Sequence, residues 1–370
     1  MTLPTPPPVT PPLLPACPFV AGPMIRDPRL FVGRKDLLQS MTTLMTGVQP
    51  TSINLVGERR IGKSSLLYHF LQTWEQRVQD VSRYVVIYLS LQDADCRSRN
   101  GLYQAVAKEL LSRPLVRRRR NLAGSLSAGV ADDSAFANAL AQWKQNRVLP
   151  VLCLDEFEVL LKYRAEFDDG FYDHLRSLMD KNALMLLLAS HKPIDVYRQE
   201  YSLTSKFFNQ AHVLYVEELI EDEANDLVRL PASTIPGATP ALSVENQQLA
   251  RQWGGTHPYL LQLAATFLCQ ARQQGKDTAW ARKQYEVEEH RLYEPASPVP
   301  HLWPLVRLLV WSLPIRLGHL SKRVGESSDK LKDWTIGIIV IVLVIAVIVA
   351  GILNIPQLIH ALFKLLGVGG

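Results

Sequence analysis

Hydrophobic and polar positions divide the chain into regions of different character. From Phe31 onward, short apolar runs alternate with amphipathic stretches, a pattern typical of a parallel β-sheet covered by helices on both faces. The predicted strands are the apolar runs 52–56, 84–89, 148–154, 184–189 and 213–216. Helical spacing over 102–111 and 134–145 predicts two helices after the second strand. An α/β fold with a parallel five-stranded sheet follows.

The other regions lack this alternation. Residues 1–28 contain ten of the 24 prolines, which predicts an extended or disordered arm. The sheet region is predicted to span 29–217. Helical spacing then continues over 218–292, beginning with the acidic turn of EELIEDEANDLV, and predicts a helical lid. A connector over 293–333 follows.

One segment near the C-terminus is long and apolar enough to span a membrane. Residues 336–353 carry no charge, and a helix over 334–355 would be about 33 Å long. Lys322, Arg323, Lys330 and Lys332 precede the segment, whereas only His360 and Lys364 follow it. This bias predicts a single span in the inner cell membrane, with the large N-terminal part in the cytoplasm. Residues 356–370 have the spacing of a short amphipathic tail.

Composition adds little to this picture. The formal charge of +5 is mild for 370 residues and does not indicate a dedicated nucleic-acid binder. Four adjacent arginines, Arg117 to Arg120, fall in a predicted polar loop, where they either contact an anionic partner or are simply solvated. The four cysteines have no metal-binding spacing, which indicates a reducing compartment.

The stretch INLVGERRIGKSSLL combines a strand, a glycine-bounded loop and a helix. Its residues 57–64 match the phosphate-binding pattern G-x-x-x-x-G-K-[ST] at every fixed position. In this motif, backbone N–H groups and the helix N-terminus receive the phosphates, Lys63 approaches the β and γ oxygens, and Ser64 holds Mg²⁺. The predicted ATP-binding residues here are Gly57, Glu58, Arg59, Arg60, Ile61, Gly62, Lys63, Ser64 and Ser65.

Carboxylates at the end of a later strand complement this loop. The strand VLPVLCLDEFE ends in Asp155 and Glu156, and such an aspartate orients magnesium in P-loop enzymes. Glu156 is placed to orient or deprotonate an attacking water. Glu158 is expected to be a solvated neighbour. Ser190 and His191 end the next strand, LMLLLAS; a polar group there senses the γ-phosphate if that strand lies beside the one bearing Asp155.

Together these motifs resemble the archaeal-type ATPases and related STAND proteins (signal-transduction NTPases with numerous domains) within the AAA+-like P-loop group. The resemblance covers about 19–290 and includes FVGRKDLL, GERRIGKSSLL, VLCLDEFE, LLLASHK, SLTSKFFN and GGTHPYLLQL. It implies that Val32, Gly33 and Arg34 lie beside the adenine. It also implies that His257 and Pro258 lie over the nucleotide, although Thr256 makes this lid motif looser than the family pattern.

The same resemblance implies a basic residue that reaches a γ-phosphate, often in a neighbouring subunit, and Arg198 and Lys206 are the candidates. The chain departs from the family after residue 293, where a winged-helix domain is usual. The leading hypothesis is a membrane-anchored signalling switch that binds Mg-ATP and hydrolyses it slowly, and whose nucleotide state controls homo-oligomerisation and an output at the membrane. An unknown protein partner is also expected. Two alternatives stay open, a nucleic-acid-associated ATPase and a membrane scaffold that merely holds nucleotide.

Overall fold

A computed structural model of the chain describes residues 17–127, 129–130, 132–233 and 237–293. Contacts divide the chain into two units, Met1–Arg291 and Leu292–Gly370, and the interactions discussed below lie within the first. The predicted membrane span 334–355 and the tail 356–370 lie outside the described residues, as does the connector except for its first residue, Tyr293. Within the described ranges, no helix has the length and apolar character needed to cross a bilayer.

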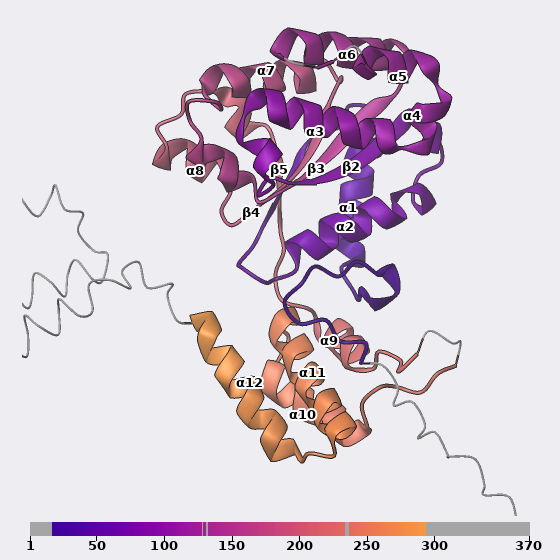
Figure 1. Cartoon of the computed structure of the whole chain (residues 1–370), viewed down its shortest axis with the longest axis vertical. Coiled ribbons are helices and arrows are strands. Elements are labelled where there is room, and N and C mark those ends of the chain that lie inside the picture. The colour runs from indigo at the N-terminus through magenta and orange to yellow at the C-terminus, as the bar shows by residue number, and fades with distance from the viewer. Residues whose placement is uncertain (1–16, 128, 131, 234–236, 294–370) are drawn as a thin grey trace, which may run out of the picture. The chain divides into compact units, whose positions relative to one another are not determined.

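In the described part of the chain, five parallel strands form one sheet in the order β2-β3-β4-β1-β5 (Figure 1). The strands are β1 (Ile53–Val56), β2 (Tyr84–Ser90), β3 (Leu149–Asp155), β4 (Met185–Ser190) and β5 (His212–Tyr215). The predicted parallel five-stranded sheet is therefore confirmed, and each strand starts within one residue of its predicted position. Because β4 lies between β1 and β3, the carboxyl ends of these three strands meet at one edge of the sheet.

Helices cover both faces of this sheet, and alternate strand residues point to each side. Leu152 and Leu154 of β3 pack with the helices α3, α5, α6 and α7, whereas Val151 and Cys153 pack with α1 and α2. Figure 1 shows these two helical layers around the strands. The helices up to β5 are α1 (Lys35–Thr46), α2 (Lys63–Thr73), α3 (Arg99–Ser112), α4 (Pro114–Arg118), α5 (Arg120–Ser127), α6 (Asp133–Gln145), α7 (Asp169–Asp180) and α8 (Ile194–Glu200).

The polar loop predicted around Arg117 to Arg120 is instead mostly helical. Arg117 and Arg118 end α4, Arg120 begins α5, and Arg119 alone lies between the two helices in extended backbone. Val116 and Leu122 anchor the two helices, because both side chains are fully buried in the core on that side of the sheet. Apolar anchors on either side of the arginine run thus override its polar character.

After β5 the chain is helical, with α9 (Glu221–Val228), α10 (Val244–Gly254), α11 (Pro258–Gln274) and α12 (Thr278–Tyr293). The N-terminal segment 17–27 contacts both α11 and α2. Val20 N donates to Gln262 Oε1 at 2.9 Å, and Ile25 N donates to Ser65 Oγ at 3.1 Å. Part of the proline-rich arm is therefore an extended strap across these two helices, while residues 1–16 lie outside the described residues.

Candidate nucleotide-binding site

The glycine-bounded loop joins β1 to α2, as its motif predicts. A Cβ at Gly57 would lie 2.5 Å from the carbonyl oxygen of Val216, so only glycine fits where the loop leaves the sheet. Arg60 and Gly62 both have left-handed backbone, with φ of 64° and 99°. The loop backbone turns at these two residues before α2 begins at Lys63.

Lys63 lies inside this loop. Its Nζ donates to the carbonyl oxygens of Gly57 at 2.6 Å and Glu58 at 2.7 Å. Burial lowers the pKa of Lys63, while the negative charges of Glu158, Asp155 and Glu156 oppose that shift. Two of the three ammonium protons thus bond to loop carbonyls, and the third has no hydrogen-bond partner among the described residues, so it can reach a phosphate oxygen.

The serines that follow Lys63 differ in their surroundings. Ser64 is partly accessible on the first turn of α2. Ser65 is buried, and its hydroxyl accepts the hydrogen bond from Ile25 N. The Ser65 side chain therefore fixes the N-terminal strap, and Ser64 is the accessible hydroxyl of the pair.

Asp155 is the last residue of β3 and is 5% exposed. Its carboxylate accepts hydrogen bonds from Tyr88 Oη at 2.8 Å and from Glu156 N at 3.1 Å. Burial, and next the charge of Asp155, raise the pKa of Tyr88, so this hydroxyl stays a donor. Asp155 is thereby held in one orientation at the strand end.

Glu156 has a left-handed backbone conformation, with φ of 58°. Burial raises the pKa of its carboxyl, and the negative charges of Asp155 and Glu158 raise it further. A carboxylate with a raised pKa is a stronger base than a solvated one. The predicted general-base role for Glu156 is chemically reasonable on these grounds.

Glu158 is not the solvated neighbour that the sequence suggested. Its side chain is 17% exposed, and its Oε1 lies 3.0 Å from Nε2 of His191. The other oxygen, Oε2, is buried and has no hydrogen-bond partner among the described residues. Burial lowers the pKa of His191, so a neutral ring donates to Glu158. Sequence reasoning missed this pair because the two residues are adjacent only across β3 and β4.

Ser190 ends β4 beside the phosphate loop, but its hydroxyl is already engaged. It accepts a hydrogen bond from Nδ2 of Asn54 at 2.7 Å and donates to the carbonyl oxygen of Lys192 at 2.7 Å. The Oδ1 atom of Asn54 in turn accepts from Ile194 N at 3.0 Å. The single hydroxyl proton of Ser190 thus bonds within the protein. The sequence held one signal for this network, because Asn54 is a polar residue within the otherwise apolar strand INLV, but the sequence analysis did not interpret it.

Arg34 and Gly33 connect the region before α1 to the segment after β5. Arg34 N donates to Glu223 Oε1 at 2.6 Å, and a Cβ at Gly33 would lie 2.4 Å from the Cδ of that glutamate. The guanidinium of Arg34 donates to the carbonyl oxygens of Ile61 at 3.4 Å and Glu218 at 3.2 Å, and also to that of Glu217. Burial lowers the pKa of Arg34. Val32 is half-buried in the same turn.

The lid motif begins α11. The Nδ1 atom of His257 accepts a hydrogen bond from Leu260 N at 3.4 Å, and Pro258 is the first helical residue. Burial lowers the pKa of His257, and the charges of Glu218 and Glu58 act on the ring in the opposite direction. Tyr259, which the sequence analysis did not select, lies 4.3 Å from the guanidinium carbon of Arg60, measured to its ring centre. A residue of the phosphate loop thus contacts α11 directly.

The remaining predicted site residues lie either on the phosphate loop or after β4, outside hydrogen-bonding contact with that loop. Glu58 and Arg59 are exposed on the phosphate loop, and Ile61 is buried. Arg198 donates to Oδ1 of Asn209 at 3.2 Å, and Lys206 is exposed. In the described ranges, neither Arg198 nor Lys206 has a hydrogen bond or ion pair to the loop. A role in a neighbouring subunit stays a prediction for both.

Comparisons with known proteins agree with this architecture. No protein-family model and no curated protein matches the sequence. Among solved structures, the ORC2 protein of Aeropyrum pernix, in ADPNP and ADP complexes, is similar with a TM-score of 0.52 and 13% identity, over 75% of this chain and 73% of that chain. The Walker-type ATPase PABY2304 of Pyrococcus abyssi is similar with a TM-score of 0.49 and 16% identity, over 82% and 87%. The ORC1 protein of Aeropyrum pernix, in complex with DNA, has a TM-score of 0.45 and 15% identity, over 74% and 66%. The likeness to the ORC2 structure supports an α/β P-loop NTPase fold for this chain.

Proposed function

We propose that this chain is a membrane-anchored P-loop ATPase of STAND type, in which the nucleotide state controls assembly with other copies and an output at the membrane. The observation that carries the proposal is the grouping of Lys63, Asp155 and Glu156 around one loop that also contacts the helices after β5. The predicted span 334–355 supplies the membrane link, with the ATPase part in the cytoplasm.

The donor set fits Mg-ATP. Gly57 lets the loop leave the sheet directly against Val216, Lys63 supplies a buried cation, and Asp155 supplies a fixed carboxylate. Ser64 and Asp155 would hold Mg²⁺, since this ion prefers oxygen ligands and takes few from the protein. When bound, the ion would neutralise charge on the transferred phosphate. Glu156 would orient and deprotonate the attacking water.

The helices after β5 would respond to the nucleotide through two contacts. Arg34 bonds to carbonyl groups on both the phosphate loop and the segment 217–218, and Arg60 lies against Tyr259. Phosphates that change the position of Ile61 or Arg60 would therefore alter contacts made by α11 and by the start of α9. This arrangement supports a switch more than a scaffold that merely holds nucleotide.

Lys63→Ala tests the site assignment. ATP affinity of the full chain in detergent, measured by calorimetry, should fall at least tenfold because the phosphates lose a buried cation. Lys108→Ala is the matched control, because Lys108 is exposed on α3 and has no described ion pair. Equal ATP affinity in both variants would refute the assignment. A circular dichroism spectrum checks that each variant is folded.

The switch itself is tested by particle size. In the Glu156→Gln background, which should keep ATP bound, Mg-ATP should shift the chain to a larger species in light scattering. A size that does not depend on ATP would refute nucleotide-controlled assembly and favour the scaffold alternative.

A further inference from the structure

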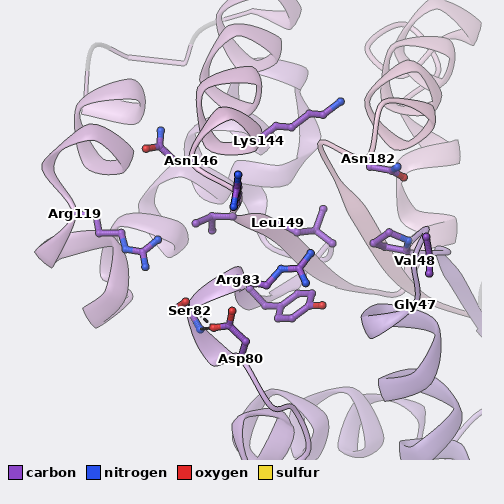
Figure 2. A pocket seen from close by; sticks show the side chains of 14 residues that line it. Gly47, Val48, Asp80, Ser82, Arg83, Arg119, Lys144, Asn146, Leu149 and Asn182 are labelled. Carbon is purple, nitrogen blue, oxygen red and sulfur yellow. Dashed lines mark hydrogen bonds between the residues drawn. The ribbon is translucent and has the colours of Figure 1, made fainter.

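A cavity of about 780 Å³ lies at the edge of the sheet opposite the phosphate loop (Figure 2). Tyr84 and Leu149 line it and are the first residues of β2 and β3. The phosphate loop follows the carboxyl end of β1, and all the strands are parallel. The cavity and the ATP site are therefore separated by the length of the sheet, so one can be altered without touching the other.

Positive charge dominates the wall of this cavity. Arg83, Arg119, Lys144 and Arg147 line it, against one carboxylate, that of Asp80. In Figure 2, Arg83, Arg119 and Lys144 come from three different elements around the space. Among the described residues, none of the four cationic side chains has an ion pair or a side-chain hydrogen bond. They are therefore available to an external anion.

The single acid does not neutralise this wall. The carboxylate of Asp80 accepts hydrogen bonds from Ser82 N at 3.1 Å and Ser82 Oγ at 2.6 Å. These bonds, and the charges of Arg83 and Arg119, lower the pKa of Asp80. Asp80 stays ionised at neutral pH, which leaves the lining three charges positive by formal count.

Favourable interaction with helix dipoles accounts for the positions of only some of these cations. Lys144 lies in the last turn of α6 and Arg147 follows it, where cations offset the negative end of a helix. Arg83 ends a helix of three residues and Arg119 follows one of five, and so few aligned peptide units give a small dipole. Among the described residues, the side chains of these two arginines have only longer-range contacts: both interact with the charge of Asp80, and the guanidinium carbon of Arg83 lies 6.0 Å from the ring centre of Tyr84.

The cationic surface continues beyond the cavity. Arg117, Arg118 and Arg120 flank Arg119 at the junction of α4 and α5, and all three are exposed. A single phosphate would not use so many cations, whereas a polymer with repeated phosphates would. Four of these cations line a hollow, which suits a strand that enters it better than a flat bilayer.

We propose that this cavity and the adjoining α4–α5 arginines bind the phosphodiester backbone of a nucleic-acid strand, independently of sequence. The contacts would be electrostatic, since phosphate contacts position a strand without reading its bases. The site would operate alongside the ATP site and would couple the ATPase to nucleic acid at the opposite edge of the same sheet.

Binding of a fluorescent 30-nucleotide single-stranded DNA and of its duplex to the full chain in non-ionic detergent tests the proposal. With about seven phosphates contacted by the four cavity cations and the three adjoining arginines, affinity for the single strand should fall about 900-fold between 50 and 200 mM salt. Arg83→Gln with Arg119→Gln should weaken binding about tenfold at 50 mM salt and reduce the slope of log affinity against log salt by about 1.4. ATP turnover should be unchanged, which separates this test from that of the proposed function.

Lys276→Gln with Lys283→Gln is the matched control, because it removes the same charge from exposed lysines after β5. Binding should survive in this variant. Equal loss in the two double variants would overturn the assignment to the cavity, and so would absence of binding to both DNA forms. Displacement by polyglutamate at equal charge would overturn the preference for phosphates.

Discussion

Replacing Ser190 with alanine separates two roles that the sequence and the structure suggest for this residue. Its position at the end of β4 predicts a group that donates a hydrogen bond to the γ-phosphate. In the structure, the Ser190 hydroxyl donates a hydrogen bond to the carbonyl oxygen of Lys192 and accepts one from the side-chain amide of Asn54. A sensor would lose turnover on substitution, whereas a structural link would lose stability.

The expected loss of stability follows from the atoms left without partners. In Ser190→Ala, the amide Nδ2 of Asn54 loses its acceptor, and Asn54 is fully buried. An unsatisfied buried donor costs about 1–3 kcal/mol. The carbonyl of exposed Lys192 can bond to water instead and adds little. We expect the melting temperature to fall by about 4–8 °C for a loss near the middle of that range.

Ser52→Ala is a control that the fold itself provides. Ser52 is also buried, and its Oγ accepts a hydrogen bond from Leu186 N at 2.9 Å, again linking the β1 region to β4. This link lies at the amino end of the strands, away from the phosphate loop. Both variants should lose similar stability and keep ATP turnover within about tenfold, measured well below their melting temperatures. A drop of 100-fold or more in turnover for Ser190→Ala alone, at unchanged stability, would refute the structural role.

Three further predictions concern catalysis, pH and the membrane. Glu156→Gln should bind Mg-ATP but hydrolyse it at least about 100-fold more slowly. The wild-type rate should decline towards acid at a pH above the usual glutamate range, because burial and Asp155 raise the pKa of Glu156; unchanged turnover would place the base elsewhere. Burial lowers the pKa of His69 from 6.5 to about 4, so the unfolded chain binds a proton in this window that the folded chain does not. Stability should therefore fall as pH drops from about 6.5 to about 4. His69→Phe keeps a ring beside Phe31 and should make the melting temperature less dependent on pH in this range. An equally steep decline in the variant would contradict the assignment to His69. A chain ending before Trp334 should be soluble and bind ATP but lose its output, and full activity of that fragment would remove the membrane from the proposal.

Strands β1 to β4 were predictable because each is a largely apolar run that is mostly buried between helices, and β5 was predictable from its apolar residues although this edge strand is partly exposed. The phosphate loop was predictable because its chemistry needs particular residues at fixed spacing. The partners of those residues were not, since they come from other strands. The pairing of Glu158 with His191 and that of Asn54 with Ser190 depend on sheet order, which spacing along the chain does not encode.

The arginine run shows a different limit. Its composition indicates a loop, but the position of a helix depends on which neighbouring side chains reach the core. Val116 and Leu122 are buried in the core, and three of the four arginines between them, Arg117, Arg118 and Arg120, are helical. The four consecutive arginines thus indicated an exposed surface, which the structure has, and a loop, which is instead mostly helical.

The junction of β1 and β5 has a genetic consequence. Val216 N donates to the carbonyl oxygen of Val56 at 2.7 Å, and Gly57 passes against the carbonyl of Val216. The last residue of β1, which precedes the phosphate loop, is therefore hydrogen-bonded directly to the first residue after β5, which leads into α9. Second-site suppressors of a damaged loop should accordingly map to residues 216–219 and to Arg34, rather than to the interior of the sheet.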